Sequence, residues 1–153
     1  ESYLLAWYFA AFHTQTDAWD KRKKKGFVFT IGDEPNLQSL PISAVKEVMG
    51  DAAEGQSTYS ADELLELAQR RNHVYHIHVE HGYRSCDDAW KQLLGPNLIV
   101  VKDHREISQI IIDTVLSHAD DVAGDTAGDN VRDNVETIEK IADSVEDDVE
   151  EML

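Results

Sequence analysis

The sequence is poor in cysteine, in basic residues and in long hydrophobic runs. Its single cysteine, Cys86, excludes an internal disulfide and fits a reducing compartment, so we expect a cytoplasmic protein. No stretch approaches the roughly 18 consecutive apolar residues of a transmembrane helix, and the apolar run at 3–12 lacks the basic flank and cleavage site of a signal peptide. The 14 lysines and arginines are outnumbered by 30 acidic residues, and the net charge of −16 argues against nucleic acid or an anionic membrane as a partner.

The spacing of apolar residues predicts one α/β domain over residues 1–119. Short apolar runs without alternation, typical of strands buried on both faces of a parallel sheet, lie at 27–31 and 97–102, and a third strand is expected at 73–80. Helical patterns surround them at 2–13, 43–49, 62–71, 86–94 and 106–118. Strands that alternate with helices predict a three-layer, mostly parallel sheet with right-handed crossovers.

Several local patterns refine this prediction. The run at 2–13 is apolar nearly all round, which indicates a buried helix. Segments 35–41 and 51–59 are expected to be loops. Ser60-Ala61-Asp62-Glu63 predicts a capping box at a helix start. The basic run at 21–25 is interpreted as the solvated end of a helix, with a phosphate-binding patch as the alternative.

The composition changes at residue 120. Residues 120–153 contain 13 acidic and two basic residues, which gives a net charge of −11. From Val131 to Met152, apolar residues recur at alternating spacings of four and three, which predicts an amphipathic helix or a short coiled coil. Because like charges disfavour self-association, we expect this acidic helix to dock on a basic surface, or else to be a frayed tail.

One stretch is more indicative of function than the rest of the chain: Lys25-Gly26-Phe27-Val28-Phe29-Thr30-Ile31-Gly32-Asp33-Glu34. Here an apolar strand ends in a turn with two carboxylates. Ligands of open α/β sheets gather at the carboxyl ends of strands, so Asp33 is the first candidate site residue. An acidic turn without further function is an equal alternative.

This stretch, with the order of helices and strands around it, resembles the C-terminal half of a von Willebrand factor A-like domain of the kind found in bacteria and phages. The resemblance implies a metal-ion-dependent adhesion site, where oxygen ligands from separate loops hold Mg²⁺ and a partner's carboxylate completes the coordination. Asp33 matches the aspartate of the third loop, and Ser2, or Glu1 beside it, lies about where the second-loop residue is expected.

The chain departs from this family in two respects. The family's D-x-S-x-S loop occurs nowhere in it, so we expect Mg²⁺ to bind this chain alone weakly or not at all. In the family fold, the strand that bears this loop lies beside the strand at 27–31, which should therefore present an unpaired apolar edge. We expect a fragment of a longer protein, incomplete at its N-terminus, or a half-domain that another chain completes.

The resemblance implies a module for metal-assisted protein–protein interaction, not an enzyme. The loops at 33–36 and 81–86 would frame the partner site, with Glu34, Asn36, His81 and Tyr83 as contact residues. Such bacterial domains often work beside AAA+ ATPases of the MoxR type, which makes an ATPase of this class a candidate partner.

A histidine-rich strand gives the rival hypothesis of a metal-dependent enzyme. On a strand, His76, His78 and Glu80 share a face, and imidazoles two residues apart can chelate Zn²⁺, Fe²⁺ or Mn²⁺. Structural histidines in the sheet interior are the simpler interpretation, with His81 nearest the expected ligand end of the strand. A third hypothesis is a degenerate structural domain that binds no metal and works through its acidic helix.

Overall fold

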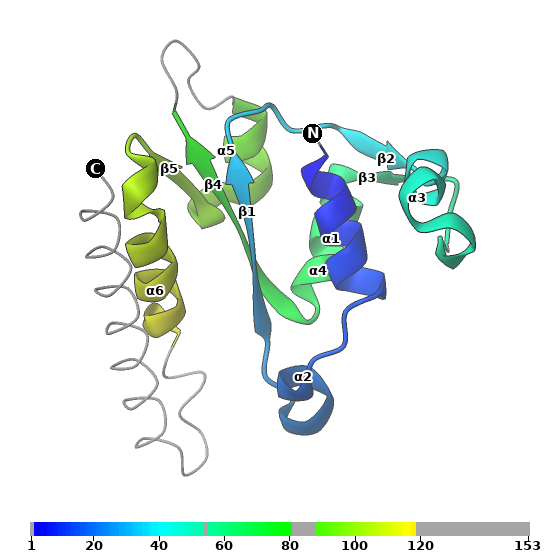
Figure 1. Cartoon of the computed structure of the whole chain (residues 1–153), viewed down its shortest axis with the longest axis horizontal. Coiled ribbons are helices and arrows are strands. Elements are labelled where there is room, and N and C mark those ends of the chain that lie inside the picture. Colours follow the sequence, from blue (N-terminus) through cyan, green and yellow to red (C-terminus); the bar gives the residue numbers. More distant parts are fainter. Residues whose placement is uncertain (1, 54, 81–87, 119–153) are drawn as a thin grey trace, which may run out of the picture. The chain divides into compact units, whose positions relative to one another are not determined.

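The computed structural model describes residues 2–53, 55–80 and 88–118 (Figure 1). The chain divides into two units, Glu1–Val115 and Leu116–Leu153, and all the described strands belong to the first. Among the described residues, no helix is long and apolar enough to cross a membrane. The predicted acidic helix at 131–152 lies outside the described residues, as do His81 and Tyr83.

The centre of the first unit is a parallel sheet of three strands in the order β1-β4-β5. These strands are β1 (Gly26–Gly32), β4 (Asn72–Val79) and β5 (Leu98–Val101). Helix α4 (Ala61–Gln69) lies between β1 and β4 in the sequence, and α5 (Asp88–Leu94) lies between β4 and β5. The predicted α/β fold with a mostly parallel sheet is therefore confirmed.

Of the remaining helices in the described part of the chain, three follow the predicted ranges 2–13, 43–49 and 106–118 closely, and the one at 17–22 ends in the basic run at 21–25, where a helix end was expected. These helices are α1 (Tyr3–Phe12), α2 (Asp17–Arg22), α3 (Ile42–Met49) and α6 (Ile107–Ser117), with short 3₁₀ turns η1 (Gly50–Ala52), η2 (Gly95–Asn97) and η3 (His104–Glu106). The capping box of α4 is present. The Glu63 amide donates to Ser60 Oγ (3.2 Å), and the Ser60 amide donates to Glu63 Oε2 (2.7 Å), so two amides that the helix leaves unpaired are satisfied.

One face of the sheet packs against helices α1, α4 and α5. On this face, the Tyr3 ring of α1 meets the His76 ring of β4 edge-on, with centroids 4.8 Å apart, and the Trp90 ring of α5 stacks on it at 3.8 Å. The core continues with Leu4, Trp7, Tyr8, Leu40, Val45, Tyr59, Leu64, Leu65, Ala68, Val74 and Leu94. Helix α6 runs on the opposite side of the sheet from α1 and α4 (Figure 1).

Two predictions about burial are wrong. Strand β1 is not buried on both faces, because Thr30 is its one buried residue and Ile31 keeps 44% of its surface exposed. Helix α1 is not buried all round either, since Phe9 is 50% exposed and Phe12 is 41% exposed. Both elements therefore present apolar surface to solvent.

The predicted loops contain a small second sheet. Strands β2 (Ser39–Pro41) and β3 (Thr58–Ser60) pair antiparallel, with Leu40 opposite Tyr59. Each strand has three residues, too few for a period-2 pattern to be recognised in the sequence. Leu40 and Tyr59 are both buried, so the ladder is an extension of the core.

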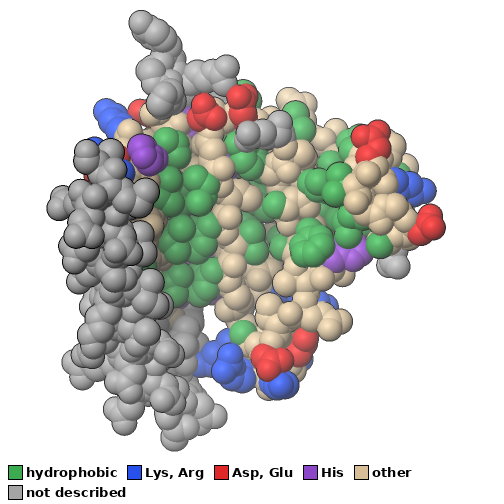
Figure 2. Space-filling model, in the orientation of Figure 1, with side chains coloured by type: hydrophobic (Ala, Val, Ile, Leu, Met, Phe, Trp, Pro, Cys, Tyr) green, Lys and Arg blue, Asp and Glu red, His purple; other side chains and the backbone are tan. Residues whose placement is uncertain are grey.

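Strand β1 lies at the edge of the parallel sheet. It pairs with β4 along its whole length, from Gly26 opposite Asn72 to Gly32 opposite His78, and no other described strand lies on its outer side. The predicted open edge is thus found for the described residues. In Figure 2, hydrophobic side chains form a continuous area between the positions that α6 and β1 have in Figure 1.

Candidate functional site

The end of β1 and the beginning of α1 meet at the carboxyl edge of the sheet. The side chain of Tyr3, the first residue of α1, lies over Gly32, the last residue of β1, and its hydroxyl occupies the place that a Cβ atom on Gly32 would need. Gly32 is required here because the tyrosine ring approaches the backbone so closely. The two predicted metal ligands are next to this contact in the sequence, since Ser2 precedes Tyr3 and Asp33 follows Gly32.

Ser2 has an unusual environment for a residue at a helix start. It stands at the N-cap position of α1 with an extended backbone, where a serine hydroxyl normally accepts a hydrogen bond from the first turn. Here the hydroxyl makes no capping bond, and Oγ is buried without a hydrogen-bond partner among the described residues. A buried polar atom without a partner is costly, by roughly 1–3 kcal/mol.

The turn after β1 is held against α5. The Trp90 indole Nε1 donates a hydrogen bond to the Glu34 carbonyl oxygen (3.1 Å), and both Asp33 and Glu34 are half-buried. Asn36 follows in the same turn, and its Oδ1 atom is buried without a hydrogen-bond partner among the described residues. Beside this contact lies an open groove of about 370 Å³, lined by Asn36, Gln38, Ala61, Asp62, Ala89, Gln92 and Leu93.

Two histidines of β4, His76 and His78, lie on the same face as Thr30 and Gly32, as their register requires. His76 is fully buried under Trp90, and its Nδ1 atom is 2.9 Å from Thr30 Oγ1. His78 is also buried, 6.0 Å from His76 between ring centroids, and pairs with Gly32 at the carboxyl edge. Neither ring nitrogen of His78 has a hydrogen-bond partner within the described part of the chain.

The described residues provide only part of a metal site. Mg²⁺ in proteins prefers octahedral oxygen coordination and keeps several waters. Asp33 offers one carboxylate and Ser2 one hydroxyl, and no group of three or more His, Cys, Asp or Glu side chains able to hold a metal occurs among the described residues. This set does not fit a full Mg²⁺ site without ligands from elsewhere. Glu80 likewise does not form such a group with His76 and His78.

The strongest local charge pair at the carboxyl edge follows β5. Arg105 bonds to both carboxylate oxygens of Asp103, through Nε (3.0 Å to Oδ1) and Nη2 (2.8 Å to Oδ2), and its amide adds a further bond. These hydrogen bonds lower the pKa of Asp103 to about 2. Asp103 is therefore ionised and paired with Arg105, whereas no lysine, arginine or histidine of the described residues forms a salt bridge with Asp33.

Two site residues were not predicted from the sequence. Tyr3 fixes the start of α1 on β1, and Trp90 ties α5 to both Glu34 and His76. The signal for each was weak, because an aromatic residue in an apolar helix indicates a core position and nothing more. No family model, curated protein or solved structure matches the chain, so the geometry of the site has to support the assignment of function.

Proposed function

We propose that the chain is a cytoplasmic protein-interaction module, similar to the C-terminal half of a von Willebrand factor A-like domain, that contacts its partner at the carboxyl edge of β1. The supporting observation is the packing of Tyr3 over Gly32, which brings Ser2 and Asp33 to one edge. The half-buried carboxylates of Asp33 and Glu34 belong to this surface, and the groove beside α5, which Asn36 lines, extends it.

A divalent cation would assist the contact only if ligands are added. The partner's carboxylate is one such ligand in the proposed mode, and the remaining ones come from outside residues 2–118. By itself the chain is expected to bind Mg²⁺ weakly or not at all. Asp33 then acts mainly as a polar contact that orients the partner, with the ion as a bridge between two negatively charged surfaces.

The open edge of β1 supports an interaction role independently. Soluble proteins commonly shorten, charge or cover their edge strands, because unpaired backbone groups and apolar side chains promote association. Here the edge ends at Asp33, and Ile31 beside it is 44% exposed. A partner that adds a strand to β1 would place its own chain next to the acidic turn, which joins the two surfaces into one binding region.

The experiment measures affinity for an AAA+ ATPase of the MoxR type, the partner class that the resemblance implies. Biolayer interferometry is run in Mg²⁺ and in EDTA on the full chain, on Asp33→Asn and on the control Asp113→Asn, which removes the same charge from the exposed face of α6. We expect Asp33→Asn to weaken binding at least tenfold, equivalent to about 1.4 kcal/mol, and the control to bind as the unmodified chain does. Equal affinities of all three chains, or no binding at all, would overturn the proposal.

A metal-dependent enzyme on β4 is the second candidate, and the environment of His78 favours it. His78 is a buried imidazole whose two nitrogens find no hydrogen-bond partner among residues 2–53, 55–80 and 88–118, and a transition metal could bind one of them. Calorimetric titration of Zn²⁺ distinguishes the two functions. Micromolar or tighter binding that His78→Ala abolishes and Asp33→Asn leaves intact would move the enzyme hypothesis to first place.

A further inference from the structure

Half of the lysines and arginines of the chain gather at the amino end of the sheet. Seven of the 14 lie in two short segments, namely Lys21, Arg22, Lys23, Lys24, Lys25, Arg70 and Arg71. The first segment leads from α2 into β1, and the second leads from α4 into β4. The segments meet because the amide of Gly26 donates to the carbonyl oxygen of Arg71 (2.9 Å) and Gly26 pairs with Asn72. We call these seven residues the amino-end basic cluster.

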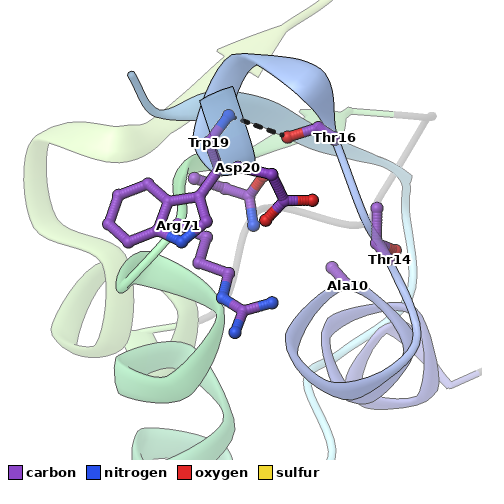
Figure 3. Close-up of a pocket in the computed structure, with 7 residues that line it drawn as sticks. Ala10, Thr14, Thr16, Trp19, Asp20 and Arg71 are labelled. Atoms are coloured by element: carbon purple, nitrogen blue, oxygen red, sulfur yellow. Dashed lines mark hydrogen bonds between the residues drawn. The ribbon is translucent and has the colours of Figure 1, made fainter. Parts of the chain in front are cut away.

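The cluster is a surface and not a cavity. All of its members except Lys24 are exposed, and basic side chains appear beside α2 in Figure 2. Beneath them, α2 and the turn before β4 enclose a space of about 10 Å³, lined by Trp19, Asp20 and Arg71 together with neighbouring residues (Figure 3). This space holds about one water molecule, so a small-molecule ligand does not fit there.

Ion pairs and the two helix ends explain only some of the positive charges in this cluster. Lys21 Nζ lies 2.7 Å from Asp17 Oδ2, and Arg70 Nη2 lies 3.7 Å from Glu66 Oε1. One or two cations suffice to complement the last turns of α2 and α4. With Lys24 left aside, six cations of the cluster have three neighbouring carboxylates among the described residues, those of Asp17, Asp20 and Glu66. This leaves a local charge of +3 in a chain whose net charge is −16.

We propose that the amino-end basic cluster binds an acidic segment of a partner polypeptide. Lys23 places its ammonium 5.8 Å from the centre of the Trp19 ring, so the surface offers an aromatic group among its cations. A peptide of acidic residues with an occasional apolar one matches both features. A nucleic acid is less suitable, because its charge continues along its whole length and would extend beyond the cluster over a negatively charged chain.

This surface is distinct from the site around Asp33. The parallel register puts the cluster before the first residue of β1 and the acidic turn after the last one. A substitution that abolishes binding at one end of the sheet can therefore leave binding at the other end intact. The inference does not depend on the proposed function.

Fluorescence anisotropy with the full chain and a short labelled peptide of alternating Glu and Ser tests this proposal. We expect binding that weakens at least tenfold between about 50 and 200 mM salt, because the contact is between charges. The double variant Arg22→Glu/Lys25→Glu should lose at least tenfold in affinity. The control Lys46→Glu/Lys102→Glu changes the net charge equally at exposed positions on α3 and after β5, and should bind as the unmodified chain does.

Three results would overturn the proposal. They are failure of the unmodified chain to bind the peptide, equal losses in the two double variants, and tighter binding of a length-matched oligothymidylate than of the peptide. Because the substituted side chains are exposed, both variants are expected to keep the melting temperature of the unmodified chain, which checks that they fold.

Discussion

The Trp90 indole joins the turn after β1 to the core by two contacts at once. Its Nε1 donates to the carbonyl oxygen of Glu34 at 3.1 Å, and its ring stacks on His76 with centroids 3.8 Å apart and planes inclined by 7°. The residue is fully buried. The position of the acidic turn, and hence of Asp33, is therefore coupled to the packing of α5 on the sheet.

Replacement of Trp90 tests this coupling. Trp90→Phe keeps an aromatic ring but removes the hydrogen bond to Glu34, and we expect a loss of about 1–3 kcal/mol from the free energy of unfolding. Trp90→Ala should cost more, about 3–5 kcal/mol. Denaturant unfolding measures both. Amide shifts in the Asp33–Asn36 turn should change in Trp90→Phe, and unchanged shifts there would show that the indole does not position the turn.

The contact of Tyr3 with Gly32 gives the second prediction. A methyl group at Gly32 has no room beside the tyrosine hydroxyl, so Gly32→Ala should destabilise the fold by about 1–3 kcal/mol. In a Tyr3→Ala background the same substitution should cost much less. A double-mutant cycle by denaturant unfolding measures the coupling. Additive losses would mean that Tyr3 and Gly32 do not touch.

The open edge of β1 predicts a tendency to self-associate. A lysine on an exposed edge strand opposes strand pairing, so Ile31→Lys should reduce concentration-dependent aggregation with little loss of stability. Val48→Lys is the matched control, because Val48 is 68% exposed on α3, away from the edge. Light scattering at increasing protein concentration compares the three chains. An equal effect of both lysines would indicate a general effect of charge and not an edge.

Asp103 gives a prediction for pH. Its pKa in the folded chain is about 2, chiefly because the Arg105 side chain donates hydrogen bonds to the carboxylate. Since this value lies below that of the unfolded chain, roughly 3.9, the interaction stabilises the fold above that value and is lost as the pH falls toward 2. Arg105→Gln should raise the pKa of Asp103 toward its usual range in an NMR titration. An unchanged pKa would contradict the role given to Arg105.

Much of the fold was predictable because its signals are local. The apolar runs of β1 and β5, the capping box of α4 and the glycine after α3 each determine one element within a few residues. The amphipathic pattern at 106–118 likewise predicts α6. Where the apolar pattern and the capping or turn residues indicate the same element, the sequence predicts its ends to within two or three residues.

The site was less predictable because it depends on contacts between distant segments. Asp33 is visible as a carboxylate after a strand, but nothing local shows that Tyr3 covers Gly32 or that Trp90 reaches Glu34. The exposure of Phe9 and Ile31 was also missed, because apolar composition alone predicts burial and does not reveal which face remains uncovered. The gathering of Arg70 and Arg71 with the lysines before β1 likewise required the strand register.

Hydrogen–deuterium exchange on the chain, alone and mixed with a MoxR-type ATPase, tests the central claim most directly. A partner at the carboxyl edge should slow amide exchange at 31–36, in the last two residues of β1 and the acidic turn, and leave α6 at Ile107–Ser117 unchanged. Protection confined to α6, or protection at 31–36 that persists in Asp33→Asn, would contradict it. Slowed exchange at 31–36 that disappears in Asp33→Asn would establish this edge as the partner site.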